Sequence, residues 1–395
     1  MSPAGAKPPA ATSVLVRPGA AVPNASDGAA SGPQHVEVPT HYDAVLLSGF
    51  GGPEGQDDVI PFLRNVTRGR GIPDERLEEV AHHYRHFGGV SPINQQNRDL
   101  RQALEKALAE AGLNLPVIWG NRNWAPYLND TLTAAHAAGH RRLLAIQTSA
   151  YSSYSSCRQY REDWADALQD AGLQAELVID KVRPFFNHPG FVQPFIDGVR
   201  TAVAEAAGEG IGPDELEVLF CTHSIPTTDA ELSGPPDFAS AYPKQHEAVA
   251  EYVMTQAAPG LAWQLVYQSR SGPPSQPWLE PDVNDAITAL TGRRGVILVP
   301  LGFVSDHMEV LWDLDTEAVE TATEAGLWVR RTPTPGVDPA FVDALVDLVA
   351  ERVEGRPVGQ RAAVTGPGPW YDICRPGCCE NRRLGFKPAI AGLAP

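Results

Sequence analysis

The chain has 395 residues, of which 43% are hydrophobic and 20% charged, a composition typical of globular proteins long enough for two domains. Its formal net charge of -17 at pH 7 repels polyphosphate and no basic stripe interrupts it, so we expect no nucleic-acid partner. No run of about 18 apolar residues and no signal-peptide pattern occur, which argues against an integral membrane segment and favours a cytoplasmic location.

Residues 1–40 are rich in Ala, Pro, Gly and Ser without a helical or strand period, and we expect a disordered extension there. Beyond it, short β-branched runs alternate with longer amphipathic stretches, such as 98–112 and 283–292, that are expected to be helices. The runs expected to be strands are 43–50, 116–124, 141–149, 175–182, 216–224, 261–269, 295–305 and 326–333.

Alternation of strands with helices predicts an α/β fold whose parallel sheets are covered on both faces. The runs form two sets of four, so we predict two similar doubly wound, Rossmann-like domains, each with a parallel four-stranded sheet, and a cleft between them. The expected divisions are 41–184 and 185–354 for the two α/β domains, and 355–395 for a linker and a cysteine-bearing tail. Ligands of such folds bind beyond the carboxyl ends of the strands.

Charged residues follow the expected strand 295–305 at this carboxyl end. Asp306, His307 and Glu309 come directly after it, and the next 20 or so residues have a helical pattern. Glu309, Asp313 and Glu317 stand at i, i+4 and i+8 and are expected to share one helix face. Two interpretations stay open: a solvated acidic face, or a file of oxygen ligands that passes a cation toward His307 and Glu309.

A second strand end supports a functional site. The run 216–224 ends in His223 and Ser224, and Pro226 prevents the strand from simply continuing. One histidine at a strand end is more often a hydrogen-bonded structural residue than a catalyst. Two strand ends that each deliver a histidine beside a carboxylate or hydroxyl to one cleft favour a functional site.

The segments around these residues resemble a known family. They are HSIP at 223–226, GFVSDHMEVLWDLDTEA at 302–318, GGPEGQDDVIPFLRN at 51–65, FGGVSPINQQ at 87–96 and YQSRSGPPSQPWLEPD at 267–282. In order and spacing they are similar to ferrochelatases, and the similarity runs from about residue 43 to 353. The resemblance implies two chelatase-type domains with a porphyrin cleft between them, and insertion of ferrous iron into a porphyrin without an organic cofactor.

The resemblance also implies roles for individual residues. His223 is expected to be the catalytic proton acceptor or a metal contact on one side of the porphyrin, and Glu309 its carboxylate counterpart across the cleft. A neutral imidazole can perform either task, because its unperturbed pKa is about 6.5. His307, Asp313 and Glu317 are expected to form a metal route. Asp313 stands where the family usually has glutamate, so one arm of that route is shorter.

Residues that hold the porphyrin and its propionates are implied in the same way. Ser91, Tyr84 and Tyr160 match positions where the family holds the macrocycle, and Arg68 and Arg70 are further candidates, because propionates need hydroxyl and cationic donors. Phe50 occupies a position where some relatives have a tyrosine. Phenylalanine cannot ligate a metal, so we expect no axial protein oxygen there.

Five cysteines form a separate signal. Cys221 lies inside an expected buried strand and is interpreted as a core residue. Cys157, Cys374, Cys378 and Cys379 can supply four thiolates, which suit either zinc or an iron–sulfur cluster. The resemblance implies a 2Fe-2S cluster held by these four residues, with Cys157 as the internal ligand of actinobacterial members, although the adjacency of Cys378 and Cys379 strains ligation by both.

The expected partners are therefore coproporphyrin III and ferrous iron, because the segment 149–163 and the Ala, Gly and Pro enrichment resemble actinobacterial enzymes that act on this porphyrin. The expected product is Fe-coproporphyrin III (coproheme), in heme biosynthesis. A ferrochelatase acting on protoporphyrin IX and a non-catalytic porphyrin or heme carrier are the alternatives. The presence of both His223 and Glu309 argues against the carrier. A monomer is compatible with the sequence.

Overall fold

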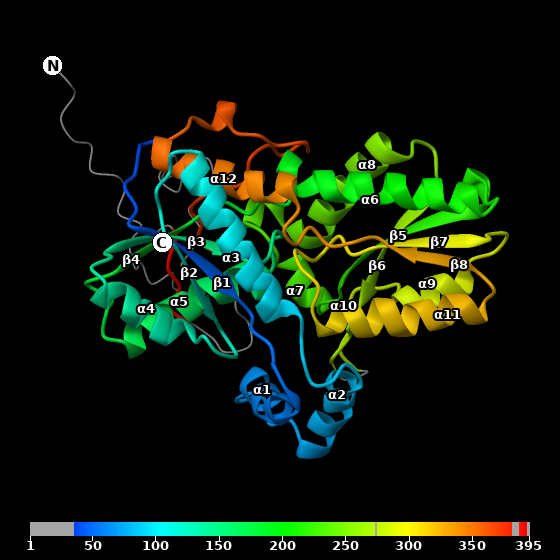
Figure 1. Cartoon of the computed structure of the whole chain (residues 1–395), viewed down its shortest axis with the longest axis horizontal. Helices are drawn as coiled ribbons and strands as arrows, with labels where there is room; N and C mark the ends of the chain where they lie inside the picture. Colours follow the sequence, from blue (N-terminus) through cyan, green and yellow to red (C-terminus); the bar gives the residue numbers. More distant parts are fainter. Residues whose placement is uncertain (1–34, 273–274, 381–386, 393–395) are drawn as a thin grey trace.

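The computed structural model describes residues 35–272, 275–380 and 387–392. Two parallel four-stranded sheets form its centre (Figure 1), and they confirm the predicted fold class. The first sheet has the order β2-β1-β3-β4 and the second β6-β5-β7-β8. The strands are β1 (Ala44–Gly49), β2 (Val117–Asn121), β3 (Arg142–Gln147), β4 (Val178–Lys181), β5 (Leu216–His223), β6 (Trp263–Gln268), β7 (Gly295–Val299) and β8 (Trp328–Arg331).

Helices connect the strands and cover the sheets. Figure 1 shows α1 and α2 apart from both sheets, and α12 beside α3 and α6. The helices are α1 (Val59–Val66), α2 (Asp74–His86), α3 (Ile93–Glu110), α4 (Leu128–Ala137), α5 (Gln159–Asp170), α6 (Pro189–Gly208), α7 (Thr227–Glu231), α8 (Ala241–Ala257), α9 (Val283–Ala289), α10 (Met308–Trp312), α11 (Val319–Glu324) and α12 (Pro339–Glu354).

The central strands are apolar on both faces because helices cover both faces of each sheet. All six residues of β1 and all five of β7 are buried. The largest hydrophobic core contains Val45 and Val117 of the first sheet together with Phe220 and Val299 of the second. The two halves therefore share one core, and the predicted division into domains at 184/185 stays a prediction.

The strand order brings the segments that follow β5 and β7 to the same edge of the second sheet. In the second sheet β5 is followed by β6 on one side, and the chain then returns to β7 on the other side of β5. Between β5 and β7 the connections leave in opposite directions, and the carboxyl ends of such strands form the usual binding crevice of doubly wound folds. His223 ends β5, and the segment that contains Asp306 and His307 follows β7.

The helix predicted after β7 is interrupted. It begins as α10, widens into a π-helical segment η6 (Asp313–Ala318), and continues as α11. A π segment inserts extra backbone into a helix and is frequent at functional sites. The i, i+4, i+8 spacing assumed for Glu309, Asp313 and Glu317 therefore does not describe a regular α-helix.

Two segments expected to be irregular make specific contacts. Residues 1–34 of the expected disordered extension lie outside the described residues, but the backbone N–H of Val36 donates to Asp372 at 2.7 Å and that of Thr40 to the Val353 carbonyl at 3.2 Å. Within the expected linker, Arg361 forms a buried ion pair with Asp372 at 2.6 Å. The start of the described chain and the tail are thus held together.

In the part of the chain that the structure describes, no helix combines the length and apolarity needed to cross a membrane.

Candidate active site and cysteine cluster

His223 and Glu309 face each other where β5 ends and α10 begins. His223 Nε2 lies 3.6 Å from Glu309 Oε2, and the two side chains are 32% and 49% exposed. The other ring nitrogen, Nδ1, hydrogen-bonds to the Ser224 carbonyl, which can only accept, so Nδ1 carries the proton of the neutral ring. Nε2 is then the atom with a free lone pair, and it can accept a proton or contact a cation.

The pair is strongly coupled electrostatically. Burial by itself lowers the pKa of His223, but the charge of Glu309 and its hydrogen bond outweigh burial and raise this pKa to about 8. Burial raises the pKa of Glu309, and His223 more than reverses the effect, lowering it to about 2. At neutral pH the pair is therefore mainly imidazolium and carboxylate, and His223 becomes a proton acceptor as the pH rises through about 8.

We expect the His223 imidazole to titrate near pH 8 in the protein without porphyrin. Glu309→Gln should lower this pKa toward or below 6.5, because the opposing charge disappears and burial remains. The pKa of His223 in both proteins is measured by NMR of histidine-labelled samples between pH 5 and pH 9, in steps of about 0.3 pH unit. Buried His246, whose pKa burial lowers to about 3, is the internal control and should not titrate in either protein. An unchanged His223 midpoint in Glu309→Gln would contradict the assignment.

Asp313, one member of the expected metal route, is hydrogen-bonded to the end of β6. Asp313 accepts hydrogen bonds from Ser269 Oγ and from Gln268 Nε2, the latter at 3.2 Å. Burial, followed by the charges of Glu309 and Glu317, raises the pKa of Asp313 to about 7, although the Ser269 bond opposes this. Asp313 therefore keeps its proton to a higher pH than an ordinary aspartate does.

His307 and Glu317 lie at the two ends of this group. His307 caps α10, with its Nδ1 accepting from the Glu309 backbone N–H at 3.2 Å, and burial lowers its pKa. Glu317 accepts from Trp312 Nε1 at 2.9 Å, a contact over five residues that fits the π segment. His307 lies beside Glu309, Glu317 acts by its charge on Asp313, and the part of both residues in a metal route stays a prediction.

Asp306 is occupied by a structural network. Its two carboxylate oxygens accept from Arg331 at 3.0 and 3.2 Å, and Thr334 donates to one of them at 3.0 Å. Arg331 also forms a two-pronged pair with Asp315 of the π segment, at 2.7 and 2.8 Å. One guanidinium thus ties the connection after β7 to the π segment, and both oxygens of the Asp306 carboxylate are used in this structural contact.

Tyr84 is the expected porphyrin contact that lies nearest this group. Burial, followed by the charge of Glu309, raises its pKa, and its ring packs on Phe62 at 5.8 Å. Its helix, α2, also meets α10: the His83 ring stacks on Trp312 at 4.0 Å and 7°. This contact between α2 and α10 was not predicted from the sequence. The cluster of histidines around Tyr84 in α2 is the sequence feature that could have indicated it.

The other expected porphyrin contacts lie in different surroundings. Ser91 is 4% exposed, and its N–H donates to the Pro53 carbonyl at 2.9 Å. Tyr160 is 5% exposed, with its hydroxyl 3.3 Å from Thr148 Oγ1 and the Arg122 guanidinium over its ring at 4.6 Å. Their roles stay predictions.

Arg68, Arg70 and Phe50 were also singled out in the sequence. Arg68 and Arg70 are exposed between α1 and α2. Phe50 packs edge-on against Phe62 at 6.3 Å.

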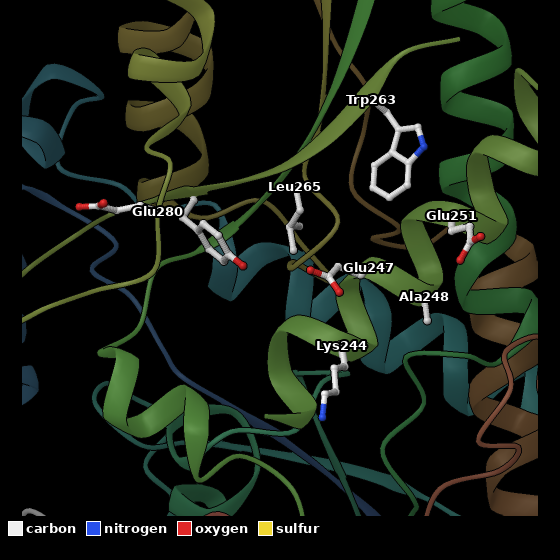
Figure 2. Close-up of a pocket in the computed structure, with 8 residues that line it drawn as sticks. Lys244, Glu247, Ala248, Glu251, Trp263, Leu265 and Glu280 are labelled. Atoms are coloured by element: carbon white, nitrogen blue, oxygen red, sulfur yellow. The ribbon is translucent and has the colours of Figure 1, made fainter. Parts of the chain in front are cut away.

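Two cavities among the described residues are lined by side chains other than those of His223 and Glu309. One, of about 540 Å³, lies between α8 and β6, where Glu247 and Glu251 stand beside Trp263 and Leu265 (Figure 2). The other, of about 760 Å³, is lined by residues of α3, α6 and the segment after β8.

Four of the five cysteines form one buried cluster: Cys157, in the π-helical segment η3 (Tyr154–Arg158), and Cys374, Cys378 and Cys379 of the tail. All are free thiols no more than 5% exposed, and the sulfurs of Cys378 and Cys379 are 3.8 Å apart. Cys379 has a φ of 53°, and this left-handed conformation lets two adjacent residues both turn inward. Cys221 lies instead in the core, with its Sγ 3.4 Å from the Leu219 carbonyl, as predicted.

Buried cations surround this cluster. Arg161 donates through Nε to the Ile390 carbonyl at 2.7 Å, while its NH2 group has no hydrogen-bond partner among the described residues. Burial lowers the pKa of Arg161, but the four cysteines together raise it. Hydrogen bonds from the thiols of Cys157 and Cys378, followed by the charges of Arg161 and Lys181, lower the pKa of Cys374. The contacts with Cys374, together with burial, raise the pKa values of Cys157 and Cys378, so Cys374 is the thiol that ionises most readily, and the buried guanidinium beside it suits an anionic group.

No group of three or more His, Cys, Asp or Glu side chains within the described ranges already has the arrangement of a metal site.

These features define a class: an α/β protein with two parallel sheets, an imidazole paired with a carboxylate at the carboxyl end of a strand, and a separate buried thiol cluster. A family model described as ferrochelatase matches residues 42–353. The chain therefore belongs to the ferrochelatase family.

Individual relatives are similar over almost their whole length. A coproporphyrin III ferrochelatase of Leifsonia xyli subsp. xyli (strain CTCB07) is 63% identical over 94% of this chain and 99% of its own. One of Streptomyces coelicolor (strain ATCC BAA-471 / A3(2) / M145) is 54% identical over 89% of this chain and 96% of its own. Among solved structures, SirB from Bacillus subtilis with Fe3+ matches with a TM-score of 0.47 at 12% identity, covering 82% of this chain and 100% of that chain.

Proposed function

We propose that the protein inserts ferrous iron into coproporphyrin III and yields Fe-coproporphyrin III (coproheme) in heme biosynthesis. The names of the most similar relatives support the substrate. The structural observation that carries the proposal is the pair of His223 Nε2 and Glu309 Oε2, 3.6 Å apart at the carboxyl end of β5. Both metal and porphyrin are substrates, and no organic cofactor is needed.

The reaction exchanges two pyrrole N–H protons for one ferrous ion, so two protons must leave the macrocycle. His223 is the proton acceptor, because its Nε2 has the free lone pair once the resting imidazolium has lost its proton. Glu309, with a pKa of about 2, stays ionised and stabilises positive charge on the imidazole or the entering metal. Asp313, with a pKa of about 7, can carry protons or cations between this pair and Glu317.

Ser91, Tyr84 and Tyr160 hold the macrocycle in this proposal, with His307, Asp313 and Glu317 as the metal route. Coproporphyrin III has four propionates where protoporphyrin IX has two, and hydroxyl and guanidinium donors bind such carboxylates well. Arg122, which lies over the Tyr160 ring, adds a cation to this side.

The test is anaerobic incubation of the protein with ferrous iron and each porphyrin, alone and in competition, followed by absorption spectroscopy. We expect kcat/KM for coproporphyrin III to exceed that for protoporphyrin IX by about tenfold or more, because polar groups built for additional carboxylates are left unpaired by the other porphyrin. A preference for protoporphyrin IX would assign the alternative substrate. Tight binding of both porphyrins without any metal insertion would instead identify a carrier.

We also propose that Cys157, Cys374, Cys378 and Cys379 hold a 2Fe-2S cluster. Four buried thiols without a disulfide, beside a buried guanidinium whose NH2 lacks a partner among the described residues, fit an anionic group of this kind. Such a cluster supplies one-electron chemistry when bound. Zinc held by the same four thiolates is the alternative. Five free cysteines also agree with a cytoplasmic location, where thiols stay reduced.

A further inference from the structure

The first turn of α8 is a buried polar hub formed by Tyr242, Gln245 and His246. The three residues are no more than 6% exposed, although all carry polar groups. Buried polar groups are normally retained where each is hydrogen-bonded, because an unpaired one destabilises the fold. The partners of this hub belong to three different segments: the end of β5, the segment around Ser233 that follows α7, and the segment before Cys157.

The hub is hydrogen-bonded to the backbone of His223, whose side chain is the proposed proton acceptor. Tyr242 Oη donates to the backbone carbonyl of His223 at 2.9 Å and lies 2.8 Å from Thr222 Oγ1. Thr222 Oγ1 is in turn 3.0 Å from His246 Nε2. Burial lowers the pKa of His246 to about 3, so the ring is neutral, and its Nδ1–H donates to the Tyr242 carbonyl at 2.8 Å.

These roles determine where the remaining protons lie. His246 Nε2 must accept, so the Thr222 hydroxyl donates to it. The Tyr242 hydroxyl then shares its single proton between the His223 carbonyl and Thr222 Oγ1. No other atom of this set can donate to the His223 carbonyl in place of Tyr242.

The same hub is connected to the tail. The Tyr242 backbone N–H donates to Ser233 Oγ at 2.8 Å. The next residue, Gly234, donates its N–H to Cys379 Sγ at 3.1 Å and accepts from the Cys379 N–H at 3.2 Å. Gly234 has a φ of +85°, and an added Cβ would lie 2.5 Å from Ala241 Cβ and 2.6 Å from the Phe238 carbonyl, so only glycine fits.

A third connection reaches the segment before Cys157. The Ser152 N–H donates to Gln245 Oε1 at 2.8 Å, and Gln245 Nε2 donates to Ser152 Oγ at 3.1 Å. The Tyr151 ring stacks on His246 at 3.5 Å and 13°. The segment before Cys157 therefore contacts α8 directly, and the tail is connected to α8 through Gly234 and Ser233.

We propose that Tyr242 is a positioning residue, whose hydroxyl fixes the end of β5 so that His223 faces Glu309, and whose turn transmits the placement of the cysteine-bearing tail to that site. The proposal deepens, and rests on, the role of His223 in metal insertion. Among the described residues, the hydrogen bonds of the Tyr242 hydroxyl go to the His223 backbone and to Thr222, and not to Glu309 or the His223 ring. It acts through the backbone of His223 and through the Ser233–Gly234 contact with the tail.

Tyr242→Phe tests the first part, because it removes only the hydroxyl. We expect kcat to fall by about tenfold and KM for the porphyrin to change by less than about twofold, since the group that moves protons is misplaced while the macrocycle contacts remain. In the protein without porphyrin, the NMR signal of the His223 imidazole should shift. Tyr151→Phe is the matched control: its ring is equally buried, and its hydroxyl has no hydrogen-bond partner among the described residues.

Gly234→Ala tests the connection to the tail. The added methyl group must displace the Ser233–Gly234 segment, and we expect the His223 signal to shift in the same direction as in Tyr242→Phe. Gly260→Ala is the control, because Gly260 has nearly the same φ, +84°, with nothing within 4 Å of the added Cβ. If Gly234→Ala does not fold, Arg375→Gln takes its place. This variant removes the ion pair between the tail and Asp237, and the same His223 signal is measured.

The outcomes distinguish the positioning role of Tyr242 from the proposed function of the protein. Shifts of the His223 signal in Tyr242→Phe and in the tail variant, with the controls unchanged, support the proposal. An unshifted signal and unchanged kcat in Tyr242→Phe overturn it. Absence of metal insertion by the unaltered protein would instead reject the proposed function, and the NMR comparison would still report whether Tyr242 positions His223.

Discussion

His223→Ala should abolish metal insertion while coproporphyrin III still binds. The imidazole is the group placed to accept a pyrrole proton, and its Nε2 is the only ring atom free to do so, since Nδ1 is held by the Ser224 carbonyl. Loss of a positioned general base typically lowers a rate by about 10²–10⁴-fold. The ring is not expected to anchor the macrocycle, so the dissociation constant should change little.

The measurement combines anaerobic metallation followed by absorption with a porphyrin-fluorescence titration of the same samples. Glu309→Gln should lower the rate of metal insertion to a similar extent. Asp313→Asn should lower it less, because Asp313 is proposed to lie on the route to the His223–Glu309 pair and not in the pair itself. His41→Ala is a control, since that side chain is 89% exposed. Near-normal turnover of His223→Ala would remove the assignment of this residue as the proton acceptor.

Cys157→Ser should remove the 2Fe-2S cluster and loosen the tail. Cys157 is the one member of the cysteine cluster that lies outside the tail, so a metal group ligated there ties residues 370–380 to the α/β body. Metal binding of this kind contributes directly to folding. The unaltered protein should be reddish brown and the variant colourless, and limited proteolysis should cut the variant earlier in the part of the tail beyond Asp372.

The contacts outside the cluster set the extent of this loosening. The buried ion pair of Arg361 with Asp372 and the Val36 contact remain in Cys157→Ser, so the start of the tail should stay attached while residues beyond Asp372 become accessible. Cys221→Ala is the control and should keep its colour, because that thiol lies in the core. A colourless unaltered protein with stoichiometric zinc would sink the iron–sulfur proposal, and a bleached Cys221→Ala would identify the wrong internal ligand.

Much of the fold and the pair at its centre could be predicted from local sequence. Runs such as GVILV in β7 are apolar at every position, and short runs of this kind, rich in β-branched residues and alternating with helical segments, favour strands covered on both faces in parallel sheets. Parallel strands deliver their carboxyl ends to one edge. His223 and Glu309 could therefore be assigned to one site, and the structure places them 3.6 Å apart.

Other features depend on contacts between residues far apart in the chain. Glu309, Asp313 and Glu317 have helical spacing, but a π segment held by long-range pairs such as Arg331 with Asp315 replaces the regular helix. Val36 lies in a segment whose composition suggests disorder, yet its N–H donates to Asp372, 336 residues away. Composition reports the average tendency of a segment and carries no information about one distant partner.

The sequence by itself determined the sheet-forming runs, the strand ends that carry His223 and Glu309, and the cysteines available for a metal group, because each follows from side-chain type and spacing along the chain. Only the tertiary structure decided that Tyr242 reaches the His223 carbonyl, that Gly234 meets Cys379, and that Arg161 is buried beside four thiols. The physical reason is that a hydrogen bond or a charge interaction depends on distances of a few ångströms in space, and those distances exist only once the whole chain has packed.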